Sequence, residues 1–209
     1  MDAPFKLLSP PLCPVCRART GPESPLCGEC LRALNRSPVL RRDPPPGVFR
    51  VASCADHDGV PRAVLTAFKF RRLTGLAPVI AGYMADAAGS PVGERVLVPI
   101  PPARLRTWLR GFDPVLTLAG QVAERLELDL LQPLVRRGSR RQRGRGRAGR
   151  LADPPLIRPI EEAPGLLAGR EALLVDDVMT TGATLAAGAA ALRAAGASRV
   201  EALTFTRRL

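Results

Sequence analysis

The sequence predicts an α/β domain with a parallel sheet flanked by helices, preceded by a small cysteine-rich module. The clearest signal lies near the C-terminal end, where apolar runs at residues 172–175 and 200–206 have the character of buried strands. Between them, residues 183–195 show the apolar spacing of a helix that ends at Gly196. Strand, crossover helix and strand form a right-handed parallel unit. The second signal is a set of four cysteines, in two close pairs, within residues 1–36.

The middle of the chain supplies the remaining elements of this domain. We expect strands at residues 49–54, 95–100 and 130–135, and helices at residues 61–70, 76–88 and 114–126. The proline-rich residues 37–47 are predicted to be a stiff linker, and residues 136–165 a mobile basic loop. The expected organisation is therefore a cysteine module at residues 1–36, the linker, and a main domain at residues 48–209 that contains the loop.

The chain is strongly basic, with a formal charge of +12 over 209 residues. Such a charge favours phosphate-bearing partners, which include small polyphosphates, nucleic acids and membrane surfaces. Residues 136–150 contain eight arginines and no acid, and so contribute +8 of the total. Interleaved glycines and mutual repulsion predict that this tract stays disordered without a polyanion. Two roles remain open for it: closing over a bound pyrophosphate, and following the backbone of single-stranded DNA.

The sequence shows no pattern of a transmembrane segment or a secretory leader. The longest promising uncharged run, residues 73–85, is too short to cross a bilayer and contains Pro78. The first residues lead at once into Pro10, Pro11 and a cysteine pair, unlike a signal peptide. We therefore expect a cytoplasmic protein.

The cysteine pairs predict a structural metal site. Cys13, Cys16, Cys27 and Cys30 form two C-x2-C knuckles separated by ten residues. This spacing allows four thiolates to converge on tetrahedral Zn²⁺, and a closed four-sulfur site has a structural role. An iron-sulfur cluster and unliganded reduced thiols are the alternatives. The fifth cysteine, Cys54, has no evident orienting group and is expected to contribute to packing.

A second candidate site follows the apolar run at residues 172–175. Asp176 and Asp177 stand at the end of that run, and a turn then leads into a helix through Thr180, Thr181, Gly182, Ala183 and Thr184. Free N–H groups at a helix N-terminus can hold a phosphate, and adjacent carboxylates suit ribose hydroxyls or waters around Mg²⁺. The alternative is a simple helix cap with solvated acids. The ordered combination favours a sugar-phosphate site.

The stretch LLVDDVMTTGATL, residues 173–185, resembles the signature with which type I phosphoribosyltransferases bind phosphoribosyl pyrophosphate (PRPP). The chain as a whole is similar to the ComF competence family. Besides the four cysteines, this resemblance rests on Lys69-Phe70-Arg71 and on Val98-Pro99-Ile100-Pro101 followed by Arg104, Arg106 and Arg110-Gly111-Phe112. It implies a type I phosphoribosyltransferase-like parallel sheet.

The resemblance also implies roles for individual residues. Asp176 and Asp177, the candidate catalytic residues, would contact the ribose hydroxyls, and the segment from Thr180 to Thr184 would surround the 5′-phosphate. The pyrophosphate would meet the loop after Pro99, with Arg104 and Arg106. Lys69 joins the expected PRPP-binding residues. Mg²⁺ would accompany PRPP, and Zn²⁺ would occupy the cysteine site.

Two functions remain open from the sequence. One is Mg²⁺-dependent transfer of phosphoribose from PRPP to an unidentified nitrogen acceptor. The other is a non-catalytic PRPP sensor or scaffold that binds single-stranded DNA. Resemblance to the ComF family implies a role in DNA uptake during natural transformation, together with uptake machinery at the inner face of the membrane.

Overall fold

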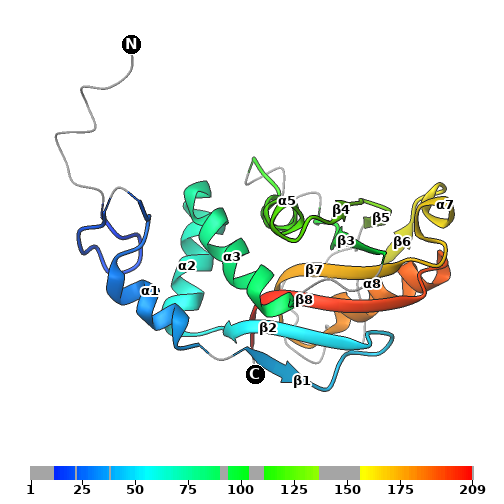
Figure 1. Cartoon of the computed structure of the whole chain (residues 1–209), viewed down its shortest axis with the longest axis horizontal. Helices are drawn as coiled ribbons and strands as arrows, with labels where there is room; N and C mark the ends of the chain where they lie inside the picture. Colours follow the sequence, from blue (N-terminus) through cyan, green and yellow to red (C-terminus); the bar gives the residue numbers. More distant parts are fainter. Residues whose placement is uncertain are drawn as a thin grey trace, which may run out of the picture.

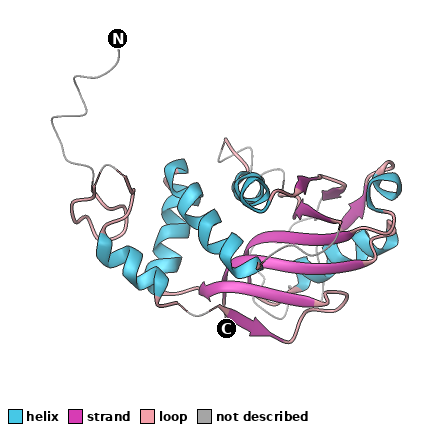
Figure 2. Ribbon diagram, viewed as in Figure 1, coloured by secondary structure: helices cyan, strands magenta, loops and turns pink. Residues whose placement is uncertain are grey.

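The architecture is a mostly parallel sheet with helices on both faces (Figures 1 and 2). The computed structural model describes residues 12–21, 23–37, 39–89, 94–103, 111–136 and 156–208. Within these residues the main sheet has the strand order β1-β2-β8-β7-β3-β4. All neighbours are parallel except the edge strand β1, which runs antiparallel to β2. The predicted fold class is therefore confirmed.

The strands of the main sheet are β1 (Leu40–Arg42), β2 (Arg50–Asp56), β3 (Arg95–Pro99), β4 (Asp129–Leu130), β7 (Glu171–Met179) and β8 (Arg199–Arg207). A separate antiparallel pair consists of β5 (Leu134–Arg136) and β6 (Ile157–Pro159). The helices are α1 (Gly28–Asn35), α2 (Gly59–Phe70), the 3-10 turn η2 (Thr74–Leu76), α3 (Ala77–Ala88), α5 (Pro114–Leu126), α7 (Ala163–Leu167) and α8 (Ala183–Ala194).

Two hydrophobic clusters hold these layers together, one on each face of the sheet. The first joins α1, α2, α3 and α5 to the sheet, and the second joins α8, α7 and the β5–β6 pair to the opposite face. Successive residues of β7 divide between them, because Leu173 and Val175 belong to the first cluster and Leu174 to the second. A strand buried on both faces accounts for the continuous apolar run in the sequence.

Close contact between α8 and the sheet depends on a glycine. A Cβ atom at Gly188 would lie 2.8 Å from Ile100 Cδ1 and 2.9 Å from Leu174 Cδ2. Such contacts are shorter than van der Waals separation, so any larger residue would push the helix outward. Gly188 therefore sets the distance at which α8 covers β7.

The helices predicted for the main domain are confirmed, but three connecting segments differ from expectation. Residues 130–135 are not one strand, since Pro133 cannot donate a ladder hydrogen bond and the chain leaves β4 there to begin β5. Residues 37–47 are more than a linker, because they contain strand β1, which pairs with β2 at the edge of the main sheet. The prediction of a loop at residues 136–165 is wrong for the final part of this range, which contains β6 and the start of α7. Residues 137–155, and with them most of the arginine tract, lie outside the described residues.

The cysteine module is continuous with the main core. Leu26 and Leu34 are 1% and 3% exposed and share a cluster with apolar residues of α2 and α3. Among the described residues, no helix has the length and apolar character needed to span a bilayer.

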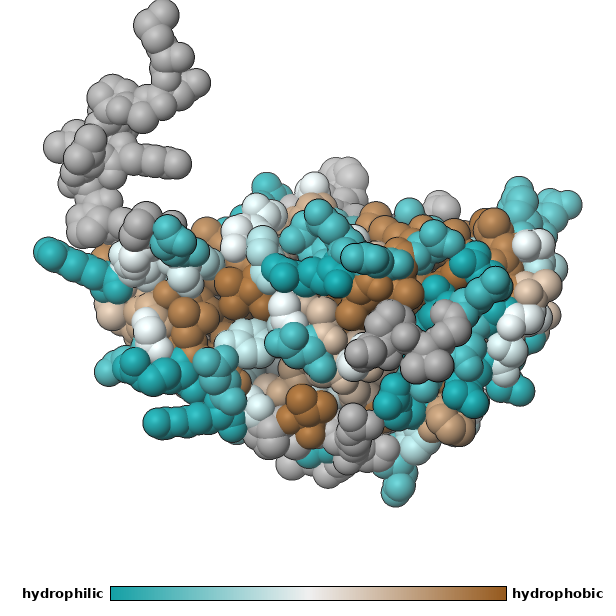
Figure 3. All heavy atoms as spheres, in the orientation of Figure 1, coloured by the Kyte–Doolittle hydropathy of each residue, from teal (hydrophilic) through white to brown (hydrophobic). Residues whose placement is uncertain are grey.

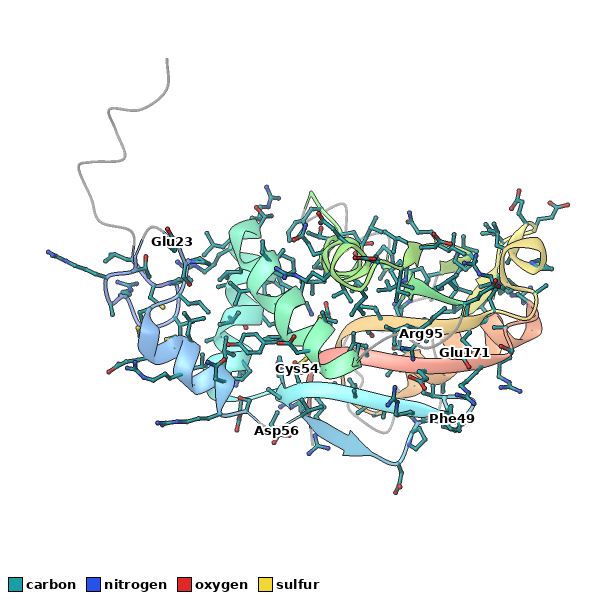
Figure 4. The ribbon with its side chains drawn as sticks, in the orientation of Figure 1. Glu23, Phe49, Cys54, Asp56, Arg95 and Glu171 are labelled. Carbon is teal, nitrogen blue, oxygen red and sulfur yellow. The ribbon has the colours of Figure 1, made fainter. Side chains whose placement is uncertain are left out.

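Two ion pairs that share Glu201 tie three strands together near their N-terminal ends. Glu201 of β8 accepts hydrogen bonds from Arg95 of β3 and, at 2.7 Å, from Arg50 of β2. The Arg95 side chain is only 4% exposed, and its Nε is buried without a hydrogen-bond partner among the described residues. Arg95 is labelled in Figure 4 near β7 and β8. Charge on Glu201 is therefore needed to neutralise a buried guanidinium.

We expect Glu201→Ala to reduce the free energy of unfolding by about 3–5 kcal/mol, because the substitution leaves Arg95 buried without its counter-ion. Glu171→Ala is the matched control, since Glu171 pairs at 3.4 Å with the half-exposed Arg199 and should cost about 1 kcal/mol or less. Urea unfolding of both variants measures the difference. Equal losses would contradict the structural role of the buried pair.

Candidate functional site

The candidate site lies where the carboxyl ends of the central parallel strands meet. Pro99 at the end of β3 is paired with Val175 of β7, and Asp176 is paired with Thr204 of β8. The turn from Thr180 to Gly182 then connects β7 to the N-terminus of α8. Ligands of open parallel sheets bind in this position, beyond the strand ends and against helix N-termini. The structure thus brings together the predicted aspartates, the threonine-glycine turn and the proline loop.

The two aspartates belong to β7 and do not lie beyond its end, since the strand continues to Met179. Adjacent residues of a strand point to opposite faces of the sheet. Asp177 is 8% exposed, and its Oδ2 lies 2.5 Å from Nζ of Lys69, which projects from the last turn of α2. Asp176 faces the opposite way, and the positive charges of Lys69 and Arg136 both act on it. The two carboxylates therefore point to opposite sides of the strand, and Asp177 makes the direct contact with Lys69.

Asp176 has a high affinity for a proton. Burial, followed by the negative charge of Asp177, raises the pKa of Asp176 from its ordinary value of 3.8 to about 7. The hydrogen bond that its Oδ1 accepts from the Asp177 N–H, at 2.8 Å, opposes this increase, as do the charges of Lys69 and Arg136. Near neutral pH the carboxyl group is thus present in both protonation states. It can accept a hydrogen bond from a sugar hydroxyl or donate one to it.

The turn into α8 requires glycine at position 182. Gly182 has φ of +77°, and a Cβ atom there would lie 2.7 Å from Cγ of Pro45. The hydroxyl of Thr181 accepts a hydrogen bond from the Ala183 N–H at 3.4 Å. Thr180, Thr181 and Thr184 are half-buried around the helix N-terminus. Backbone N–H groups and hydroxyls at this end of α8 are suited to an anion.

A cavity of about 200 Å³ lies beside the end of β3. Its lining residues are Pro99, Ile100, Pro101, Pro102, Asp113, Gln132, Leu134, Val135 and Arg136. Asp113 also caps α5, because its Oδ1 accepts hydrogen bonds from the N–H groups of Val115 and Leu116 at 3.0 and 3.2 Å. The predicted ligands Arg104 and Arg106 lie outside the described residues.

Arg136 and Gln132 are site residues that sequence reasoning missed. Arg136 was grouped with the arginine tract, and Gln132 carried no local signal. Both reach the cavity only because the chain turns from β4 into β5 beside the end of β3. One feature of the sequence indicated that Arg136 could belong to a site. Arg136 directly follows the apolar pair Leu134-Val135, which marks the end of a strand.

His57 and Cys54 are neighbours on β2 and its end, but they do not form a nucleophile-base pair. Burial, and then the charge of Lys69, lowers the pKa of His57, whose Nδ1 lies 2.9 Å from the Thr206 hydroxyl. Burial raises the pKa of Cys54 to about 12, and its thiol donates to the carbonyl of Tyr83 at 3.3 Å. A buried, protonated thiol is a poor nucleophile. These observations agree with the expected packing role of Cys54.

The four cysteines of the N-terminal module form a compact sulfur cluster. Cys13, Cys16, Cys27 and Cys30 place their sulfur atoms within 4.8 Å of one another, and Cys16 alone is exposed. Four sulfurs bound to zinc at 2.3 Å are separated by about 3.8 Å. The side chains therefore need only small adjustments to surround the ion. The cluster is compatible with the predicted structural zinc site.

Local backbone geometry explains how each pair of cysteines converges. The Cys13 N–H donates to the Ala18 carbonyl at 2.8 Å, and the Arg17 N–H donates to the Cys13 carbonyl at 2.9 Å. Arg17 completes this tight turn with φ of +63°. Cys27 is the N-cap residue of α1, and Cys30 lies in its first turn. A knuckle and a helix start thus present two sulfurs each.

Comparison with known proteins gives a match to a family model over the C-terminal part of the chain. The model of the phosphoribosyl transferase domain matches residues 116–209, a range that contains β7, the turn and α8. The matched range includes residues 173–185, where the sequence resembles the PRPP-binding signature of type I phosphoribosyltransferases. No curated protein sequence matches the chain.

Two solved structures that match part of this chain are much longer than it. One, described as the allosteric regulatory enzyme of purine biosynthesis, is 21% identical with a TM-score of 0.42 and covers 61% of this chain. Another, glutamine PRPP amidotransferase from B. subtilis complexed with ADP and GMP, is 22% identical with a TM-score of 0.41 and covers 60%. The chain spans a quarter of the length of each.

We expect the Asp176 carboxyl group to contribute a loss of stability as pH rises from about 4 to 7, because the folded state binds its proton more tightly than the unfolded state does. Asp176→Asn removes this loss. The variant should gain about 1–2 kcal/mol relative to wild type between pH 5 and pH 8. Urea unfolding at both pH values measures the gain. A stability difference that does not change with pH would contradict the raised pKa.

Proposed function

We propose that this chain binds PRPP at the carboxyl edge of its sheet and transfers the phosphoribosyl group to a nitrogen acceptor. The observation that carries the proposal is the continuous run from Asp176 to Thr184. There a strand end with two carboxylates turns through Gly182 into the N-terminus of α8. This run lies within the residues matched by the phosphoribosyl transferase domain.

The parts of PRPP differ in charge and find different surroundings along this edge. The first turn of α8, with the hydroxyls of Thr180, Thr181 and Thr184, suits the 5′-phosphate. Asp176 suits the ribose hydroxyls, because its carboxyl group can accept or donate a hydrogen bond. The cavity after Pro99 suits the pyrophosphate, with Arg136 at its wall. Arg104 and Arg106 would add positive charge on this side.

Transfer requires few protein groups beyond those that position the substrate. The acceptor nitrogen forms a bond to C1 of the ribose while the bond from C1 to the pyrophosphate oxygen breaks. Pyrophosphate leaves with that electron pair, and the acceptor nitrogen loses a proton to water. Cationic side chains stabilise the departing charge. Mg²⁺, bound with PRPP, would neutralise further negative charge on the pyrophosphate.

A non-catalytic role in PRPP sensing uses the same site and differs only in the absence of an acceptor reaction. The resemblance to the ComF family supports a place in DNA uptake, on the cytoplasmic side of the membrane and in contact with uptake machinery. The arginine tract supports contact with single-stranded DNA, because its eight positive charges are accompanied by no acid.

We expect wild type to bind PRPP with Mg²⁺, and the Asp176→Ala, Asp177→Ala double variant to lose at least about tenfold in affinity, the factor given by roughly 1.4 kcal/mol. Isothermal titration calorimetry measures both affinities. Glu161→Ala, Glu162→Ala removes two adjacent exposed acids elsewhere and serves as the matched control. Wild type that does not bind PRPP would overturn the proposal. Pyrophosphate release with a nitrogen acceptor separates the enzyme from the sensor.

We also expect replacement of the tract arginines by glutamine, with Arg136 left intact, to weaken binding of single-stranded DNA. Each lost phosphate contact should reduce the slope of log affinity against log salt concentration by about 0.7. Fluorescence anisotropy with a labelled oligonucleotide at several salt concentrations measures this slope. An unchanged slope combined with weaker PRPP binding would assign the tract to closure over pyrophosphate.

A further inference from the structure

The cysteine module contacts α2 at a position close to the candidate site. Arg71, the residue directly after α2, donates a hydrogen bond from Nη1 to the carbonyl oxygen of Pro14 at 2.8 Å. Pro14 lies within the first cysteine knuckle, directly after Cys13. Two residues before Arg71, Lys69 holds the carboxylate of Asp177. A short chain of contacts therefore connects the sulfur cluster to an aspartate of the candidate site.

Buried apolar residues reinforce this contact. Leu26 and Leu34 of the module share a cluster with Leu65 and Phe68 of α2, and all four side chains are at most 3% exposed. Figure 3 shows apolar residues on the surface in this region of the molecule, beside α1 and α2. Packed apolar residues have few alternative positions, so displacement of the module displaces the end of α2 as well.

The backbone after α2 turns sharply at a left-handed residue. Arg72 has φ of +55°, a conformation that a residue with a Cβ atom rarely adopts. The Arg71 N–H donates to the Ala67 carbonyl at 3.1 Å, so the helix ends within the same turn as Lys69. The Leu73 N–H closes this turn on the Ala67 carbonyl at 3.4 Å, and contacts of the Arg71 side chain add to it. The knuckle supplies one of these contacts through Arg71.

The knuckle has little regular structure to keep its own shape. Among residues 12–21, the ladder contacts consist of one isolated bridge between Leu12 and Arg19. Convergence of four sulfurs on a metal ion is the interaction that closes such a segment. Metal bound at the sulfur cluster would therefore add to the backbone hydrogen bonds that hold the Pro14 carbonyl in place.

We infer that the cysteine module braces the end of α2 through Arg71, so that metal occupancy of the sulfur cluster sets the affinity of the Lys69–Asp177 site for PRPP. This inference rests on the proposed binding of PRPP. Arg71 is a positioning residue in this scheme, because it acts through Lys69 and Asp177. The module then regulates the site and does not merely stabilise the fold.

A second polar contact of the module provides a matched control. The Tyr83 hydroxyl of α3 donates to Oδ1 of Asn35, at the end of α1, at a distance of 2.5 Å. Tyr83→Phe and Arg71→Ala each remove one polar contact between the module and the main domain. Only Arg71 lies beside Lys69. If weaker docking of the module were enough to lower PRPP affinity, both variants would lose affinity alike. If the module acts through Arg71, only Arg71→Ala loses affinity.

The first experiment measures PRPP affinity with Mg²⁺ by calorimetry in zinc-loaded, full-length protein. Arg71→Ala should weaken binding by about three- to tenfold, the factor that corresponds to the net contribution of one hydrogen bond. Tyr83→Phe should bind like wild type, and Arg71→Lys should recover part of the affinity. Equal affinities of wild type and Arg71→Ala, or equal losses in Arg71→Ala and Tyr83→Phe, would overturn the inference.

The second experiment removes zinc with a selective chelator, which is dialysed away before Mg²⁺ and PRPP are added. Chelation should weaken PRPP binding by wild type more than binding by Arg71→Ala, because the variant has already lost the brace. It should also speed amide hydrogen exchange at Lys69 and Arg71. If amide hydrogen exchange at Lys69 and Arg71 does not change after zinc is removed, the inference is overturned, whatever the result with PRPP. Failure of wild type to bind PRPP would instead overturn the proposed function.

Discussion

The position of β7, hydrogen-bonded to β3 on one side and β8 on the other, is the constraint on which the rest of the molecule depends. Its two faces are buried by different layers, with α2, α3 and α5 on one side and α8 on the other. A strand enclosed in this way cannot shift its register without exchanging buried apolar residues for charged ones. The same register places Asp176 and Asp177 at the edge where the candidate site forms.

Charge is distributed unequally along this sheet. Near the strand starts, Glu201 neutralises the buried Arg95. Near the strand ends, Asp177 is already paired with Lys69, whereas the half-buried Asp176 has no ion pair among the described residues. Loss of Glu201 from the first arrangement would leave a buried charge without its counter-ion. The second leaves one carboxyl group with a perturbed proton affinity, as is common at functional sites.

The N-terminal module is connected to this edge of the sheet through α2. Its apolar residues belong to the core of the main domain, and its first knuckle contacts the residue after α2. A module attached in this way differs from an independent tail, because its knuckle is hydrogen-bonded to the end of α2. The exposed Cys16 makes the cluster accessible to solvent on one side, whereas Cys13, Cys27 and Cys30 are buried.

The sequence by itself determined the local chemistry of this protein, and the tertiary structure decided which groups meet. Apolar runs, the Thr-Thr-Gly turn and the cysteine spacing are encoded in consecutive residues, so the parallel unit around α8 and the sulfur cluster could be predicted from them. Three features were beyond local pattern: opposite directions of Asp176 and Asp177, the pairing of Lys69 with Asp177, and the place of Arg136 in the cavity wall. Each feature depends on how far β7 extends and on how separate elements pack against one another. The burial of apolar side chains across the whole core determines both.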